Sequence, residues 1–150
     1  MNQTTPASLG HLRLTLEADP GGAFRAELGQ RINAFHSETV PFQSTRFTLR
    51  LHDPQSRLLG GMSGAMSRQW LFIEALWVDP TLRGHGAGRT LMTRAEAHAL
   101  AEGCHSAWLD TFQARGFYEA LGYQAFGVLE DYPPGQSRSF LRKRLIPSPA

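Results

Sequence analysis

The feature that most constrains this chain is the stretch VDPTLRGHGAGRTLM, residues 78–92. Gly84, Gly86 and Gly88 alternate with other residues between a proline-marked turn and a segment with helical periodicity. Glycine loses more backbone entropy on folding than alanine does, so three in one turn indicate that the backbone itself must be bare. At the start of a helix, unpaired N–H groups and the positive end of the helix dipole attract anions. The stretch therefore predicts a phosphate-binding turn followed by a helix.

Three other interpretations of this turn compete. A P-loop requires Lys and then Ser or Thr after its last glycine, whereas Arg89 and Thr90 follow here and the glycine spacing differs. A dinucleotide-binding turn requires its third glycine where Arg89 stands, and its strand leads into the turn without an insertion such as DPTLR. A tight turn that binds nothing would explain one glycine better than three flanked by arginines. Another kind of phosphate loop is favoured.

Composition limits the class of protein. A chain of 150 residues with 41% apolar side chains fits one domain with a real core, and a net charge of +2 does not by itself indicate nucleic acid. The single cysteine, Cys104, excludes an intramolecular disulfide framework and a multi-thiolate zinc site. The sequence has neither an apolar run long enough to span a bilayer nor a signal peptide. We expect a cytoplasmic protein that binds neither membrane nor nucleic acid.

Apolar periodicity predicts an α/β fold around a mixed sheet, in one domain over residues 10–146 with flexible ends at 1–9 and 147–150. The strand over 71–78 is apolar except for Glu74, which is typical of a strand buried on both faces. The predicted strands are 11–17, 46–51, 58–66, 71–78, 106–110, 123–130 and 139–145, and the predicted helices are 23–36, 89–102 and 113–121.

The run from Arg83 to Gly88, RGHGAG, resembles the acetyl-CoA signature Arg/Gln-x-x-Gly-x-Gly/Ala of the GNAT acetyltransferase superfamily. The resemblance covers residues 71–145, where the order of elements and the motif F-Y-x-x-L-G-Y are also similar to the family's. It implies a GNAT-like fold, a central mixed, mostly antiparallel twisted sheet flanked by helices. It also implies an N-acetyltransferase that moves an acetyl group from acetyl-CoA to a primary amine within a ternary complex.

The resemblance also implies which residues bind acetyl-CoA. The loop amides would wrap the pyrophosphate, with added charge from Arg83 and Arg89. The backbone of Leu76 would hold the thioester oxygen, and that of Val78 would pair with the pantetheine arm. Thr111 stands where many members carry an asparagine, and a hydroxyl cannot reproduce an amide contact. The implied cofactor-binding residues are Leu76, Trp77, Val78, Arg83, Gly84, His85, Gly86, Ala87, Gly88, Arg89 and Thr111.

Two side chains are implied to act in catalysis. Glu74 resembles the glutamate that serves as a base in spermidine/spermine-type members, and the alternative for it is a salt-bridged strand acid. Whether Glu74 acts directly, through water, or not at all stays open. Tyr118 matches the helix tyrosine that gives a proton to the departing sulfur of CoA, and the alternative for it is a core aromatic.

The acceptor is the part that the sequence specifies least. A small amine, an amino-acid or antibiotic amine, and a protein lysine or N-terminus all remain open, as do acyl groups other than acetyl. In relatives, the first helix region and the last strand–strand loop line the acceptor pocket. The corresponding residues here are Phe35, His36, Phe42, Trp70, Asp131 and Tyr132.

Other features of the sequence narrow the function less. The six histidines show no metal-ligand spacing, so we expect no metal. The basic run RSFLRKRL is interpreted as a closing strand with a solvated face rather than a nucleic-acid patch. The oligomeric state, a homodimer included, is left open. The rival function is an acetyl-CoA-binding sensor or interaction module without turnover, against which the presence of both Glu74 and Tyr118 argues.

Overall fold

The computed structural model describes residues 9–38 and 43–146. They belong to two units, which we call the N-terminal unit (within residues 1–41) and the sheet unit (within residues 42–150), and each is described by itself. The expected flexible ends, residues 1–9 and 147–150, lie outside the described residues except for residue 9. The single domain over residues 10–146 stays a prediction.

The N-terminal unit contains a short 3₁₀ helix, η1 (Leu9–His11), and a long helix, α1 (Ala23–Ser37). The first turn of α1 is capped from outside the helix, because the Asp19 carboxylate accepts hydrogen bonds from the backbone N–H groups of Phe24 and Arg25, both at 3.1 Å. The predicted helix over 23–36 is therefore confirmed.

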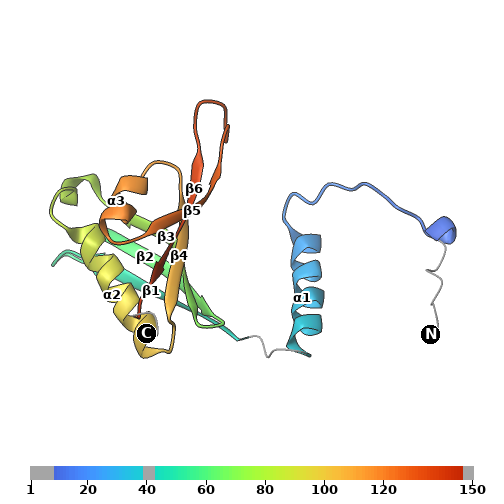
Figure 1. The fold of residues 1–150 in the computed structure, drawn as a ribbon, viewed down its shortest axis with the longest axis horizontal. Coiled ribbons are helices and arrows are strands. Elements are labelled where there is room, and N and C mark those ends of the chain that lie inside the picture. The colour runs from blue at the N-terminus through green and yellow to red at the C-terminus, as the bar shows by residue number, and fades with distance from the viewer. Residues whose placement is uncertain (1–8, 39–42, 147–150) are drawn as a thin grey trace. The chain divides into compact units, whose positions relative to one another are not determined.

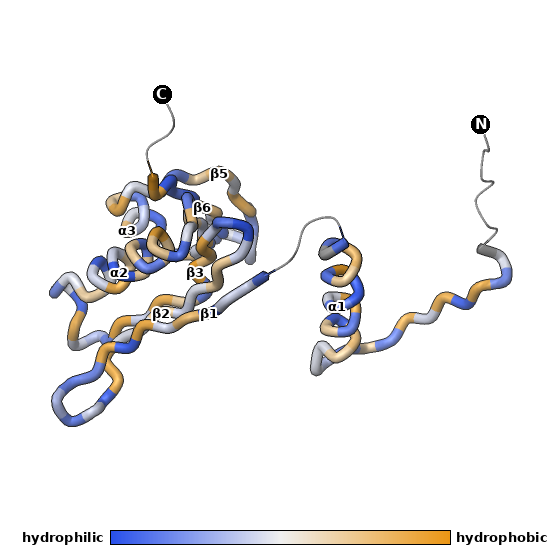
Figure 2. Tube along the Cα trace, turned by 90° about the horizontal axis from the view of Figure 1, so that it is seen from below, coloured by the Kyte–Doolittle hydropathy of each residue, from blue (hydrophilic) through white to orange (hydrophobic). Residues whose placement is uncertain are grey.

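The predicted strand over 11–17 is wrong. Apolar and polar residues do alternate along this segment (Figure 2), but residues 13–19 are extended chain without a regular element. Leu12, Leu14 and Leu16 are 61%, 98% and 101% exposed. A strand requires a partner for its backbone N–H and C=O groups, and the described residues of this unit contain no second strand. The alternation therefore encodes only an extended conformation here.

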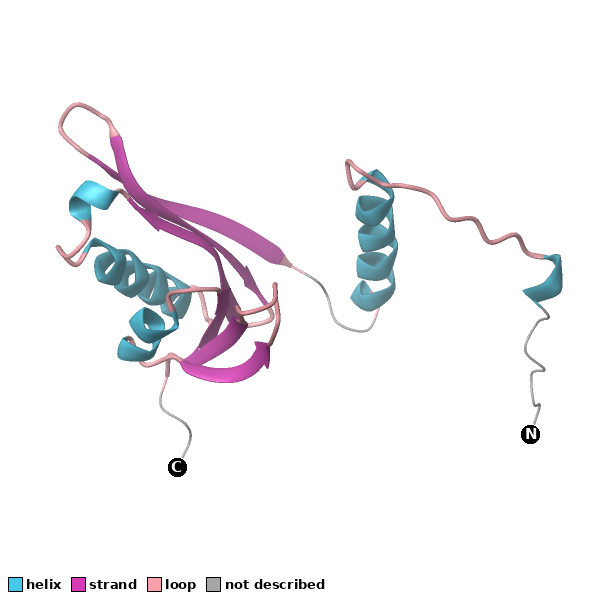
Figure 3. Cartoon of the chain, turned by 90° about the horizontal axis from the view of Figure 1, so that it is seen from above, coloured by secondary structure: helices cyan, strands magenta, loops and turns pink. Residues whose placement is uncertain are grey.

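The sheet unit is built on a six-stranded sheet in the order β1-β2-β3-β4-β6-β5 (Figure 1). All neighbouring strands are antiparallel except β3 and β4, and α2 and α3 lie on one face of the sheet (Figure 3). The predicted mixed, mostly antiparallel α/β fold is confirmed. The elements are β1 (Ser44–His52), β2 (Leu58–Ser67), β3 (Trp70–Val78), η2 (Pro80–Leu82), α2 (Ala87–Ala101), β4 (Ser106–Thr111), α3 (Arg115–Ala120), β5 (Gln124–Leu129) and β6 (Arg138–Arg144).

The core lies between α2 and the sheet. Helix α2 presents an apolar stripe at helical spacing, and alternate residues of the central strands pack against it. Glu96 is also turned inward and is neutralised by Lys143, whose Nζ lies 2.7 and 2.9 Å from the two carboxylate oxygens. The buried residues of this interface include Leu91, Met92, Ala95 and Ala99 from α2, and Leu71, Ile73, Leu109 and Leu141 from the sheet.

The expectation that residues 71–78 are buried on both faces is wrong. Leu71 and Ile73 are buried, whereas Glu74 and Trp77 are exposed on the strand's other side. A β-bulge explains the change, because Ser63 pairs with Ala75 while the next residue of β2 pairs with Ile73, which leaves Glu74 as an extra residue. After the bulge, the residues that pack against the core change from odd to even positions, Leu76 and Val78.

Candidate active site

The parallel strands β3 and β4 separate toward their carboxyl ends. They are paired only over three residue pairs, from Trp70↔Ser106 to Phe72↔Trp108. Strand β4 stays paired with β6 as far as Thr111. From Ile73 onward, the edge of β3 that faces β4 has no ladder partner within the described part of the chain. An opening of this kind, which we call the splay, leaves backbone N–H and C=O groups free to bind an extended ligand.

The glycine turn sits at the carboxyl end of β3 and starts α2. Gly86 is the N-cap with φ 78°, and Gly84 has φ 81°, both in the left-handed region that side-chain-bearing residues rarely adopt. No side chain caps the helix, and its first backbone bond runs from the Thr90 N–H to the Gly86 carbonyl at 3.0 Å. The amides of the first turn are thus left for a ligand. We call residues 83–89 the cradle.

The approach to the cradle is held rigidly. The Asp79 carboxylate accepts hydrogen bonds from the Thr81 backbone N–H (2.9 Å) and hydroxyl (2.6 Å), and these bonds lower the pKa of Asp79. The Asp79 N–H donates to the Leu59 carbonyl on β2 at 2.8 Å. The V-D-P-T sequence therefore fixes where β3 ends and where the cradle begins.

A cavity of about 650 Å³ joins the cradle to the end of β3 and to α3. It contains ten of the residues predicted at the site, including Tyr118, and its walls are mostly apolar apart from two arginines. A phosphate-bearing ligand with a long, weakly polar arm fits such a lining. The lining residues are Leu76, Trp77, Val78, Leu82, Arg83, Gly84, Gly86, Ala87, Gly88, Arg89, Ala114, Phe117, Tyr118 and Ala120.

Tyr118 occupies the inner wall of this cavity. Tyr118 is only 8% exposed, and burial raises the pKa of its phenol above the ordinary value. No described residue forms a hydrogen bond with the Tyr118 hydroxyl. The nearby Tyr123 hydroxyl also has no partner, and it is fully buried. The Phe117 ring meets the Tyr118 ring edge to face at 4.9 Å. Tyr118 is therefore a neutral phenol beside a ligand cavity.

Glu74 lies on the opposite face of the sheet from α2. Its carboxylate accepts a hydrogen bond from Arg46 Nε on β1 at 3.1 Å, and 26% of its side-chain surface is exposed. Phe47, the next residue of β1, packs against His98 of α2, so Arg46 points to the other face. Glu74 thus stands beside the splay but does not line the cavity.

Comparison with known proteins agrees with this geometry. The model of the acetyltransferase (GNAT) family matches residues 14–123. This chain belongs to the GNAT family. It is 44% identical over 94 residues to blasticidin-S acetyltransferase from Streptomyces morookaense, covering 61% of this chain and 69% of that protein. It is 33% identical over 98 residues to an acetyltransferase from Agrobacterium fabrum, covering 64% and 72% of the two chains.

Solved structures agree with the same assignment. The crystal structure of an acetyltransferase from Bacillus cereus matches with a TM-score of 0.76 at 30% identity, and the match covers 88% of this chain and 97% of that one. As a GNAT protein, the chain is an acyl-CoA-dependent N-acetyltransferase. No helix in the described residues is long and apolar enough to cross a membrane, and the same residues hold no cluster of three or more potential metal ligands.

Not every residue predicted for the GNAT cofactor site reaches the cavity. His85 and Thr111 are absent from its lining. The Thr111 hydroxyl oxygen instead accepts a hydrogen bond from the Ala114 N–H at 3.2 Å, at the entry to α3. A side-chain bond to the backbone stabilises this turn, which gives Thr111 a structural task that the sequence motif did not reveal.

The residues predicted for the acceptor pocket are scattered. Trp70 lines a different cavity of about 510 Å³, at the amino end of β3. Asp131 and Tyr132 lie in the loop between β5 and β6. Phe35 and His36 are on α1 in the N-terminal unit, where their rings meet edge to face at 5.7 Å. Phe42 lies outside the described residues.

Sequence reasoning missed several members of the site. Phe117 closes one side of the cavity, and a Cβ on Gly88 would lie 3.1 Å from its ring, which explains a third glycine where φ is ordinary. Ala114 and Ala120 give the cavity room because they are small. The available signal was the motif F-Y-x-x-L-G-Y, in which Phe117 directly precedes Tyr118.

Proposed function

We propose that this GNAT protein acetylates the amine of a small-molecule antibiotic. The observation that carries the proposal is the 44% identity to a relative named for blasticidin S. A protein lysine or N-terminus is the competing acceptor, and nothing in the lining of the site favours it.

Acetyl-CoA would be held by the cradle and by the open edge of β3. The unpaired amides at the start of α2 would receive the pyrophosphate oxygens, and Arg83 and Arg89 would add positive charge. The N–H and C=O groups of Leu76 and Val78 would pair with the amide-containing arm, since they face the splay. The N–H of Leu76 would stabilise the oxygen on which negative charge develops during transfer.

Tyr118 would protonate the departing thiolate. Its raised pKa keeps the phenol protonated at neutral pH, which a general acid requires. Its free hydroxyl and its place in the cavity wall support this role. On the opposite face, Glu74 would accept a proton from the incoming amine, directly or through water, and its bond to Arg46 would fix its orientation.

The proposal is tested by measuring CoA-thiol release from acetyl-CoA with blasticidin S, free lysine and a lysine-containing peptide. We expect turnover with blasticidin S, confirmed by a mass increase of one acetyl group, and a kcat/KM for the peptide at least about 10-fold lower. Tight acetyl-CoA binding without thiol release with any amine would instead identify a sensor. A preference for the peptide would identify a protein acetyltransferase.

A further inference from the structure

Arg138, the first residue of β6, is fixed by a carboxylate on the neighbouring strand. Its Nε and Nη2 atoms lie 2.8 and 2.7 Å from Oδ1 of Asp110 on β4, and the side chains are only 28% and 17% exposed. This pairing raises the pKa of Arg138 further. Both contacts go to the same oxygen, so Oδ2 of Asp110 has no protein partner in the described ranges.

Three aromatic rings surround the same guanidinium group. The Arg138 Cζ atom lies 5.5 Å from the centroid of Phe112, 5.7 Å from that of Tyr132 and 5.3 Å from that of Phe140. Phe112 and Tyr132 are stacked nearly parallel, with centroids 5.8 Å apart and planes at 21°. We call Asp110, Phe112, Tyr132, Arg138 and Phe140 the Arg138 cluster.

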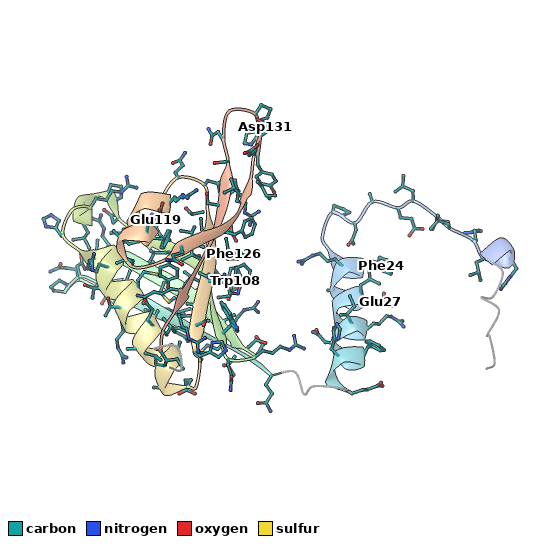
Figure 4. All side chains as sticks on the ribbon, viewed as in Figure 1. Phe24, Glu27, Trp108, Glu119, Phe126 and Asp131 are labelled. Carbon is teal, nitrogen blue, oxygen red and sulfur yellow. The ribbon has the colours of Figure 1, made fainter. Side chains whose placement is uncertain are left out.

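The cluster lies at the same end of the sheet as the cradle. Phe112 follows the carboxyl end of β4, and the register Thr111↔Ser139 brings the start of β6 beside it. The loop between β5 and β6, with Asp131 at its tip, projects beyond this end (Figures 1 and 4). The Arg138–Asp110 ion pair therefore connects the base of this loop to β4, the strand that borders the splay.

The cluster also lies on the face that carries Glu74. Leu109 and Leu141 are buried toward α2, so the alternate residues Asp110 and Phe140 point the other way. Phe112 and Tyr132 remain 50% and 45% exposed. Two nearly parallel, half-exposed rings beside a partly buried ion pair offer a flat apolar surface, and such surfaces commonly mark binding sites.

We propose that Arg138 is a positioning residue that holds Phe112 and Tyr132 as an aromatic wall of the acceptor site. The wall selects amines attached to a flat, unsaturated ring, because such a ring stacks on the exposed aromatic surface and its donors reach the free Oδ2 of Asp110. This inference rests on the proposed acetyl transfer to a small-molecule amine and adds the substrate class.

The test compares 2-phenylethylamine with 2-cyclohexylethylamine, which carry the same amine on a flat and on a puckered ring. Each is measured as an acceptor at saturating acetyl-CoA and, where it is not turned over, as a competitive inhibitor of blasticidin S acetylation. The wild-type protein should bind the phenyl compound about 2- to 10-fold more tightly, in KM or Ki. Tyr132→Leu and Arg138→Gln should remove this preference without changing the KM for acetyl-CoA, and Arg138→Lys should restore part of it.

Arg142 supplies a matched control. Arg142 Cζ lies 5.5 Å from the Phe126 ring, the same kind of contact without a carboxylate and away from the end of β4. Arg142→Gln should therefore keep the phenyl preference. Phe126 itself is not a control, because its ring lies 6.3 Å from that of Phe140 in the cluster. Because Tyr132 is half exposed, Tyr132→Leu should stay folded by circular dichroism even if Arg138→Gln does not.

Several results would overturn the inference while leaving the proposed function intact. These are equal binding of the two amines, an unchanged preference in Tyr132→Leu, or an equal loss in the Arg142→Gln control. A fall in molar mass on Tyr132→Leu with the preference unchanged would show that a second copy of the chain covers the rings. No thiol release with any amine, blasticidin S included, would overturn the proposed function and the inference with it.

Discussion

The cradle and the Arg138 cluster lie at the same end of the sheet but are built in different ways. The cradle uses the backbone of one contiguous stretch, whose glycines set φ and leave the amides of α2 unpaired. The Arg138 cluster uses side chains from two strands and two loops, and its ion pair joins residues 28 positions apart in the sequence. Under the proposed function, the contiguous backbone would bind acetyl-CoA, whereas the dispersed side chains would contact the acceptor.

Tyr118 on α3 and Tyr123 just after this helix show a similar contrast. Tyr118 and Tyr123 are both buried, and their rings lie 6.0 Å apart. Only Tyr118 lines the cavity, while the Tyr123 hydroxyl is enclosed without a partner and burial raises its pKa strongly. Position relative to the cavity, rather than residue type, therefore distinguishes the proposed acid, Tyr118, from Tyr123.

The largest expected effect tests whether the cradle depends on backbone. Gly86→Val places a β-branched residue at φ 78° and moves the amides that would hold a pyrophosphate. Loss of about two charge-assisted hydrogen bonds should weaken acetyl-CoA binding about 1000-fold in calorimetry. Gly103→Val is the control, since Gly103 has φ 93° at the other end of α2 and equally open surroundings. A similar loss of affinity in the control would point to general destabilisation.

The next effect tests the two tyrosines against each other. Tyr118→Phe should lower kcat about 100-fold with little change in acetyl-CoA affinity, because it removes only the acid. Tyr123→Phe removes an unpaired hydroxyl and should leave kcat unchanged. Because burial raises the pKa of Tyr118, loss of the wild-type rate through ionisation of the phenol should begin only at a pH higher than an ordinary tyrosine would require. Equal losses in both variants would make Tyr118 a packing residue.

A smaller effect tests the opposite face. Glu74→Gln should lower kcat/KM about 10-fold at neutral pH and much less at alkaline pH, where the amine is already deprotonated. Arg46→Gln keeps the carboxylate and removes its partner, so a milder loss with the same pH dependence is expected. Steady-state rates between pH 6 and 10 would show whether Glu74 acts as a base. A loss that does not vary with pH would indicate that Glu74 has a structural role at the bulge.

The smallest effect concerns the far end of β3. Trp70→Leu should change kcat/KM by less than about 2-fold, because Trp70 lines the cavity at the amino end of the strand and contacts His105 rather than the splay. Rates with blasticidin S would be compared before and after the change. A loss above about 10-fold would indicate that the acceptor site extends to this end of the sheet, as the resemblance to the GNAT family implied for Trp70.

The sequence by itself determined the glycine turn at the start of α2 and the order of the strands and helices of the sheet unit. These features depend on residues close together in the chain, where φ, turn chemistry and periodicity act locally. It did not determine that Glu74 is a bulge residue, because the extra residue is defined only by the register with β2. Nor could it place the alternating leucines of residues 12–16, because a strand exists only with a partner.

Only the tertiary structure brought the Arg138 cluster together. Asp110 and Arg138 meet because β4 and β6 are antiparallel neighbours, and the loop after β5 then brings Tyr132 onto Phe112. No local pattern encodes contacts between residues so far apart, since they follow from strand order and register. The glycine turn could therefore be predicted from fifteen consecutive residues, whereas the Arg138 cluster forms only when the sheet is assembled.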